Sequence, residues 1–178
     1  GYTSMIDVDS FVDYFIINEL SSNADAGNYS TYIYKGTDNL YRMCVWDFNN
    51  ACNNYFEEEL PYTGFFLNNR LWFEMLIKDE DFTERVIQRY QSLYRYIDET
   101  LDFIEPALAR NDARWGSVEQ QAKGLLVPLS RNLDSRSAAE GQLKGYLRNR
   151  GEWLDENIET LRQYSASSRV KQYNEVND

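Results

Sequence analysis

The sequence contains no histidine, and this absence limits the chemistry open to the chain. Histidine is the commonest general base and a frequent metal ligand, so Ser-His-Asp, Cys-His and His-zinc sites are excluded. Cysteine is scarce: Cys44 and Cys52 are too few for a disulfide framework or a zinc site. We expect two free or buried thiols rather than the single bridge that their spacing permits. Any chemistry must use carboxylates, hydroxyls, amides, lysine or arginine.

Basic residues and long hydrophobic runs are also lacking. Eighteen Lys and Arg stand against 29 Asp and Glu, for a net charge of -11. This charge repels phosphate backbones and anionic lipid, so we expect no nucleic-acid partner. The chain has no apolar run of about 18 residues and no signal-peptide pattern at its start, so we expect no membrane insertion. Its 178 residues, 43% hydrophobic, suffice for one domain with a core.

A buried helix and a β-hairpin are predicted near the start of the sequence. Capping residues at 7–10 precede a segment, 11–20, that is apolar on most sides of a helix. Polar residues at 21–23 end this helix. Residues 29–46 then form a hairpin, because two runs rich in β-branched and aromatic side chains flank a turn at 35–39.

Helical periodicity dominates the rest of the chain. One apolar pattern begins near Asn69, and a second continues to Pro106, which we expect to kink or end it. Residues 116–134 are loop-rich, with a short helix at 118–123, and a capping box at 137–140 begins a final long helix. The predicted apolar positions are Leu71, Trp72, Met75, Leu76, Phe82, Val86, Tyr90, Leu93, Ile97, Leu101, Ile104, Leu108, Leu143, Leu147, Trp153 or Leu154, Ile158 and Leu161.

The predicted fold class is α+β, predominantly α-helical with one small β-hairpin. No internal repeat and no linker divides the sequence. We therefore expect a single domain over residues 1–164, followed by a polar tail at 165–178 that frays.

Two aspartates are expected at the same end of the hairpin. Asp25 lies just before the first strand and Asp47 just after the second, and a hairpin brings these ends together. Two acids among amides suit a hard cation such as magnesium, with phosphate oxygens completing its ligands. In phosphoryl transfer, one Asp orients the attacking hydroxyl and another holds the metal. Asp and Asn are also ordinary turn residues, and these residues alone favour that structural interpretation.

Other prominent residues are interpreted structurally. Three tryptophans near the helical segments are expected in the core rather than on a sugar-binding platform. Arg148 and Arg150 are expected to pair with acids on a neighbouring helix, and the three glutamates at 57–59 to form a solvated acidic loop. The tryptophans are Trp72, Trp115 and Trp153.

Several dispersed blocks, in a fixed order, give the chain a resemblance to a known family. The blocks are IDVDSFVDYFIINELSSNADAGNYSTYIYK, VWDFNN, GFFLNNRLWFEMLIKDEDFTERVIQRY, NDARWG and YLRNRGEWLDENI. Together they resemble the spore coat protein H (CotH) kinase family, which are secreted or coat-associated atypical protein kinases of bacteria. The resemblance extends over residues 6–161 and implies the C-terminal lobe of an atypical protein-kinase-like fold.

The resemblance also implies roles for individual residues. The family's N-x-D loop supplies the catalytic aspartate and corresponds to Asn23 and Asp25. Its W-D-F segment supplies the metal-binding acid and corresponds to Asp47. A second metal ligand corresponds to Asn28 or Ser30: Ser30 has the kinase-like offset from Asp25, whereas Asn28 has the better ligand chemistry.

Three features depart from the family pattern. Asn49, a further candidate metal ligand, stands where many members carry a second acid, so the negative charge available to a cation is lower. Asn53 replaces a usual glycine and tolerates left-handed backbone. Only residues 1–22 precede the N-x-D loop. We therefore expect the nucleotide-binding N-terminal lobe elsewhere in the parent chain, and this chain alone to bind ATP weakly and not to turn over.

The resemblance implies the catalytic portion of a kinase that transfers phosphate from ATP, with Mg²⁺, to Ser or Thr of a spore coat or cell-surface protein. The implied partners are that substrate and the N-terminal lobe of the same parent chain. The implied location is secreted, at the cell surface or in the spore coat of a bacterium. The alternative is a non-catalytic surface scaffold or a polysaccharide-binding module.

Overall fold

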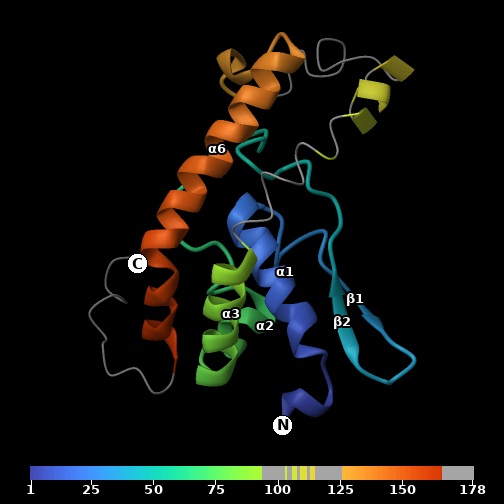
Figure 1. Ribbon diagram of the computed structural model, residues 1–178, viewed down its shortest axis with the longest axis vertical. Coiled ribbons are helices and arrows are strands. Elements are labelled where there is room, and N and C mark those ends of the chain that lie inside the picture. Colours follow the sequence, from blue (N-terminus) through green and yellow to red (C-terminus); the bar gives the residue numbers. More distant parts are fainter. Residues whose placement is uncertain (94–102, 104–105, 108, 112, 115–125, 166–178) are drawn as a thin grey trace.

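The computed structural model describes residues 1–93, 103, 106–107, 109–111, 113–114 and 126–165. Helices and 3₁₀ turns make up most of these residues, together with one two-stranded antiparallel sheet (Figure 1). The predicted α+β class with a single small hairpin is thereby confirmed. Of the described helices, none is long and apolar enough to cross a membrane. The elements are η1 Tyr2–Ser4, α1 Val8–Ser21, β1 Tyr32–Lys35, β2 Tyr41–Cys44, α2 Leu71–Leu76, α3 Glu80–Leu93, η2 Leu129–Arg131, α6 Arg136–Asn157 and η3 Ile158–Tyr164.

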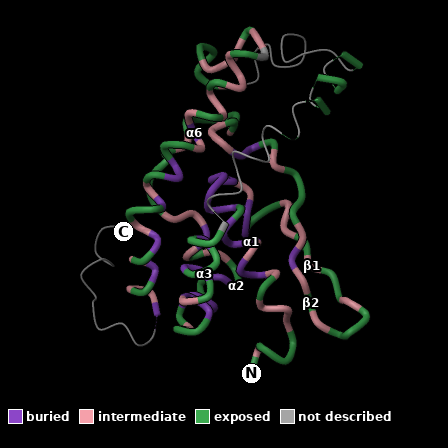
Figure 2. The backbone as a smooth tube through the Cα atoms, viewed as in Figure 1, coloured by how far each residue is buried: buried purple, intermediate pink, exposed green. Residues whose placement is uncertain are grey.

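Helix α1 begins and ends where the sequence predicts. Its N-cap is Asp7, whose side chain accepts the backbone N–H of Ser10 and so satisfies one of the free donors of the first turn. Most of its side chains are buried, as expected of a segment that is apolar on most sides. Helices α2, α3 and the C-terminal half of α6 surround it, and buried residues gather on these elements in Figure 2.

The hairpin is shorter than the predicted 29–46. Tyr32 pairs with Cys44 and Lys35 with Tyr41, so the regular strands have four residues each. The turn end of the hairpin is anchored to the start of α1: the Asp7 N–H donates to Tyr41 O, and Arg42 Nε lies 2.8 Å from Asp7 Oδ2. The anchor fixes the hairpin, and hence the loops at its open end, relative to α1 (Figure 1).

The predicted buried face of α2 is confirmed at Leu76 and wrong at its other positions. Phe73, which the predicted pattern left out, is fully buried and contacts aromatic rings of α1, including a stacked Tyr14 at 5.8 Å between ring centroids. Leu71, Trp72 and Met75 are instead exposed, so the core prediction for Trp72 is also wrong. The helix has only six residues, too few to present a full apolar stripe, and it turns Phe73 and Leu76, one turn apart, toward the core.

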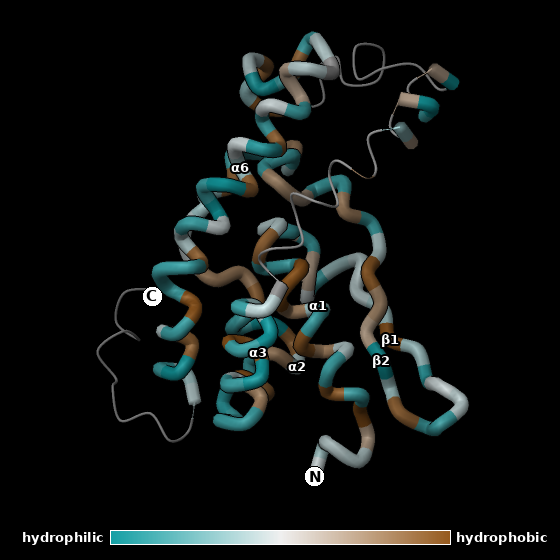
Figure 3. The backbone as a smooth tube through the Cα atoms, in the orientation of Figure 1, coloured by the Kyte–Doolittle hydropathy of each residue, from teal (hydrophilic) through white to brown (hydrophobic). Residues whose placement is uncertain are grey.

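The predicted N-terminus of α6 lies two residues too late in the sequence. Its N-cap is Ser135, whose hydroxyl accepts the N–H of Ala138, so the predicted capping box at 137–140 lies inside the first turn. An α-helix continues to Asn157 and a 3₁₀ turn to Tyr164. Buried Leu154, Ile158 and Leu161 join the main core, as predicted. Figure 3 shows that hydrophilic and hydrophobic residues alternate along α3, the pattern of a helix with one covered face.

Several predictions concern residues outside the described part of the chain. These are the helical pattern at Ile97, Leu101, Ile104 and Leu108, the short helix at 118–123, the position of Trp115, and the tail beyond Ser165. Pro106 is itself described and helical, but residues 104, 105 and 108 are not described, so the kink there stays a prediction.

Candidate functional site

Buried amides at the end of α1 fix the loop that carries Asp25. Ser22 ends the helix with left-handed backbone, and its N–H returns to the carbonyls of Asn18 and Glu19. Asn23 is 2% exposed; its Nδ2 donates to Asn18 Oδ1 at 3.0 Å, and its Oδ1 accepts the Asp25 N–H at 3.3 Å. Asn23, predicted beside Asp25 as a catalytic residue, therefore holds the backbone of that aspartate from inside the protein.

The residue before α2 holds the same loop from the opposite side. Arg70 Nη1 donates to Ala24 O at 2.8 Å and to Ala26 O at 2.9 Å. Gly27 has a φ of 78°, and a Cβ there would lie 2.8 Å from Arg70 Cβ. The close approach of Arg70 thus requires glycine both for its backbone conformation and for its lack of a side chain.

Asp47 lies just beyond the end of β2, on an exposed stretch with unusual backbone. Its φ is 57°, a left-handed conformation that is uncommon for a residue other than glycine. The Ser30 hydroxyl lies 3.4 Å from Asp47 Oδ2 and donates to it, and Ser30 is itself left-handed, with a φ of 45°. Strained backbone of this kind occurs at functional sites, where the surrounding structure holds it in place.

Asn50 connects the loop of Asp47 back to Asp25. Its Nδ2 donates to Asp25 Oδ2 at 2.8 Å, and its side chain is buried. The loop of Asp25 therefore contacts Asp47 through Ser30, and the loop of Asp47 contacts Asp25 through Asn50. These two contacts bring both acids to the open end of the hairpin. Sequence reasoning missed Asn50; its place on the turn directly after Asp47 was the available signal.

The CotH kinase protein family matches residues 1–154. The chain belongs to this family. The match confirms the resemblance drawn from the dispersed sequence blocks. Neither the curated proteins nor the solved structures gave a significant match, so no structural neighbour supports the kinase-like lobe.

The site of this CotH-family chain is poor in carboxylates for a metal. Among the described residues, no group of three or more Cys, Asp or Glu side chains could hold an ion. Asn28 and Asn49, both predicted ligands, are exposed, and their backbone groups, not their side chains, make the contacts observed: Asn28 N–H donates to Asp25 O, and Asn49 O accepts from Asn54 Nδ2. Mg²⁺ commonly takes one or two protein carboxylates and completes its shell with water and phosphate, and this donor set fits that role.

The stretch after Asp47 is tied to α1 and α6. The Cys52 N–H donates to Ser21 O at 2.6 Å, and Gln142 Nε2 donates to Cys52 O at 3.2 Å. Burial raises the pKa of the Cys52 thiol to about 11, and both cysteines are free, as predicted. Asn53 has a φ of 62°, which confirms that it adopts left-handed backbone in place of the usual glycine.

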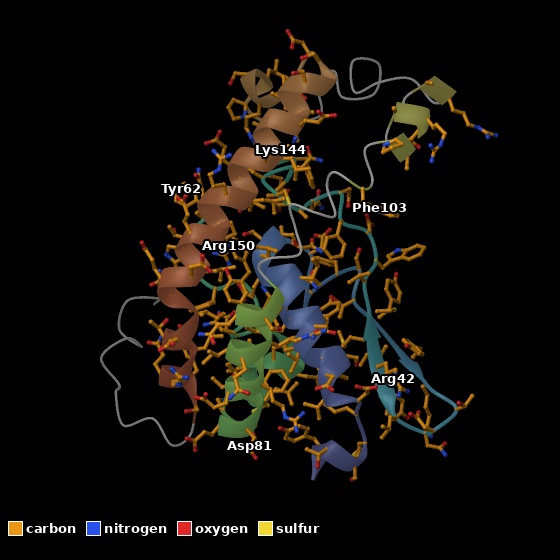
Figure 4. All side chains as sticks on the ribbon, viewed as in Figure 1. Arg42, Tyr62, Asp81, Phe103, Lys144 and Arg150 are labelled. Atoms are coloured by element: carbon orange, nitrogen blue, oxygen red, sulfur yellow. The ribbon has the colours of Figure 1, made fainter. Side chains whose placement is uncertain are left out.

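A buried ion pair supports the end of α1 that leads into the Asp25 loop. Glu19 accepts the backbone N–H groups of Phe66 and Leu67, at 3.0 and 2.7 Å, and Arg150 from α6 donates to both its carboxylate and its carbonyl. Burial raises the pKa of the Glu19 carboxyl, against the opposing effects of Arg150 and of these N–H groups. Figure 4 shows Arg150 directed from α6 toward α1, and the predicted pairing of Arg150 with a helix acid is confirmed.

Exposed aromatic side chains adjoin the two site loops in the sequence. Tyr29 and Trp46, each next to a site loop, are 72% and 64% exposed, and Tyr32 meets Trp46 edge-on at 6.2 Å between ring centroids.

Glu57–59 are exposed, as predicted for a solvated acidic loop. Trp153, the third predicted core tryptophan, is only partly buried and packs edge-on against Phe65.

Proposed function

We propose that this chain carries the two essential acids of a Mg²⁺-dependent protein kinase, which transfers the terminal phosphate of ATP to a Ser or Thr hydroxyl. The observation that carries this proposal is the reciprocal contact between the loops of Asp25 and Asp47. Membership of the CotH kinase family supports the reaction class. Phosphoryl transfer depends mainly on positioning and charge stabilisation, and two fixed acids at one site can supply both.

Asp25 orients the attacking hydroxyl and accepts its proton. Its Oδ2 already accepts a hydrogen bond from Asn50, and Tyr29 and Asn28 donate their N–H groups to its backbone carbonyl. Because these contacts hold its main chain and one carboxylate oxygen, Oδ1 is the oxygen left to receive a substrate hydroxyl. A general base must lie within hydrogen-bond reach of the proton that it removes, and a fixed carboxylate meets that requirement.

Asp47 is the metal-binding acid, with Ser30, Asn28 and Asn49 as the nearby oxygen donors. Ser30 has the direct contact with Asp47 Oδ2. Magnesium held there would supply positive charge to neutralise the charge that develops on the transferred phosphate. Because position 49 carries an amide, the site has less negative charge than that of members with two acids. Nucleotide phosphate is therefore needed to complete the metal site.

The protein substrate and its location are proposals that rest on the family resemblance and not on the site. We propose a coat or cell-surface protein of a bacterium as substrate. We also propose that the nucleotide-holding lobe belongs to other residues of the same parent chain. The net charge of -11 favours a protein over a nucleic acid as partner.

The test uses the full protein that its gene encodes, including any residues that flank this chain. Radiolabelled ATP, Mg²⁺ and a degenerate peptide library with one central Ser or Thr are the reactants. Wild type should label the peptides, and Asp25→Asn and Asp47→Ala should each reduce labelling at least about 100-fold. Glu58→Gln, in the exposed acidic loop, is the matched control and should label normally. Labelling by Asp25→Asn at the wild-type rate would overturn the proposal.

The exposure of Trp72 favours a second candidate, a non-catalytic module that binds a polysaccharide. Trp72 is 47% exposed on α2 beside exposed Leu71, which gives a small aromatic and apolar surface. Aromatic faces of this kind can pack on sugar rings. A rise in melting temperature with a soluble polysaccharide, lost in Trp72→Ala and accompanied by no transfer from ATP, would establish this function instead.

A further inference from the structure

The hydrogen bond from Asn50 to Asp25 joins two segments that are far apart in sequence. Asn50 Nδ2 lies 2.8 Å from Asp25 Oδ2, and Asn50 is 8% exposed. A hydrogen bond from an amide to an ionised carboxylate is strong and directional, and burial of the donor Asn50 limits the competition of water for its amide. This contact therefore fixes the orientation of the Asp25 side chain in a way that the exposed amides of the site do not.

Two amides divide the task of holding Asp25. Asn23 Oδ1 accepts the Asp25 N–H and so fixes the backbone, whereas Asn50 holds the carboxylate. Asn23 is itself bonded to Asn18, whose Nδ2 donates to Tyr14 O in α1. The backbone of Asp25 is thus held in place relative to α1. Its side chain is held in place relative to the turn that follows Asp47.

The chemistry at position 50 requires a hydrogen-bond donor. An ionised carboxylate only accepts hydrogen bonds, so a partner at 2.8 Å must donate one. An aspartate at position 50 would have the same shape but no N–H, and it would add a like charge beside Asp25. An alanine would leave the carboxylate free to rotate, with neither oxygen held.

We propose that Asn50 is a positioning residue for phosphate transfer. It holds Asp25 Oδ2 and thereby presents Oδ1 to the substrate hydroxyl. It also couples the orientation of the hydroxyl-binding acid to the loop of the metal-binding acid, so that both are correctly placed together. This role rests on the proposed kinase function, and it is distinct from the metal-ligand role considered for the neighbouring Asn49.

The test compares kcat and KM for Asn50→Ala and Asn50→Asp with the wild-type full protein, using ATP, Mg²⁺ and the same peptide library. Both variants should lower kcat by about 10- to 100-fold, because a catalytic group misplaced by 1 Å costs about that much. The KM values for ATP and peptide should change by less than about twofold, since Asn50 contacts neither. Asn50→Asp preserves the side-chain shape, so its kcat tests the positioning role even if Asn50→Ala does not fold.

Asn157→Ala is the matched control. Asn157 ends α6, outside both site loops, and its side chain donates at 2.8 Å to the backbone carbonyl of Trp153. Its loss should leave kcat within about twofold of wild type. Wild-type kcat in folded Asn50→Asp, or an equal loss of kcat in Asn157→Ala, would overturn the positioning role alone. A wild-type protein that transfers no phosphate would overturn the proposed function and this role with it.

Discussion

Arg150 and Glu19 form an ion pair in the core, with Nη2 and Oε2 2.8 Å apart and side-chain exposures of 0% and 2%. Arg150 also donates to the carbonyls of Tyr62 and Gly64, so one guanidinium joins α6, α1 and the segment that leads into α2. The face of the guanidinium lies over the rings of Phe66 and Trp153. Because α1 ends in the loop of Asp25, this pair supports the base of the proposed active site.

Loss of Arg150 should therefore destabilise the whole domain. Arg150→Ala leaves the Glu19 carboxylate and two carbonyls without their partner, and removal of one member of a buried pair costs about 3–5 kcal/mol. Arg148→Ala, two residues earlier on the exposed face of α6, should change the free energy of unfolding by less than about 0.5 kcal/mol. Urea unfolding measures both. A loss below about 1 kcal/mol for Arg150→Ala would contradict the role assigned to the pair.

Gly27 and Gly145 should respond oppositely to alanine. Gly27→Ala places a Cβ 2.8 Å from Arg70 Cβ on left-handed backbone, so we expect a loss of about 1–2 kcal/mol and reduced phosphate transfer. Gly145 lies in α6, and a Cβ added there would meet no neighbouring group within 4 Å, so alanine should stabilise by about 0.5–1 kcal/mol. Thermal unfolding of the two variants tests this; equal effects would contradict the close packing of Arg70 on the loop.

The Cys52 thiol should react slowly with alkylating reagents. Its pKa is raised to about 11, and the thiolate is the reactive form, so about 1% is ionised at pH 9. The rate of alkylation should rise about tenfold per pH unit and level off near pH 11. Iodoacetamide labelling of Cys44→Ser, folded and in urea, measures it, because an unfolded thiol with a pKa of about 8.5 reacts readily at pH 9. Equal rates in the two states would contradict the burial of Cys52.

Local patterns predicted much of this fold. Helix α1, the hairpin and the apolar side of α3 follow from capping residues, β-branched and aromatic runs, and helical periodicity. The buried face of α2 did not follow, because a six-residue helix carries too little periodicity to distinguish Phe73 from Trp72. Ser135 and Ser137 are both suitable N-caps, and only the structure, through the extended backbone of Ser135 and its hydrogen bond from the Ala138 N–H, distinguishes them.

The candidate site was predictable only in outline. Hairpin geometry places Asp25 and Asp47 at one end, but hydrogen bonds between loops depend on side-chain directions that sequence spacing does not give. Asn49 and Asn50 are adjacent and identical in type, and the structure exposes the first and buries the second against Asp25. The roles of Asn23 and Ser30 likewise emerge from their partners and not from their positions in the sequence.

The most direct test of the proposed function separates chemistry from nucleotide binding. For wild type, Asp25→Asn and Asp47→Ala, calorimetry measures the affinity of the full protein for ATP with and without Mg²⁺. Single-turnover assays of the same proteins measure the rate of phosphate transfer. We predict that Asp25→Asn keeps its Mg²⁺-dependent ATP affinity within about threefold while transfer falls at least about 100-fold, and that Asp47→Ala loses the Mg²⁺-dependent affinity itself. Unchanged transfer by Asp25→Asn, or unchanged Mg²⁺-dependent affinity in Asp47→Ala, would contradict the division of roles between the two aspartates.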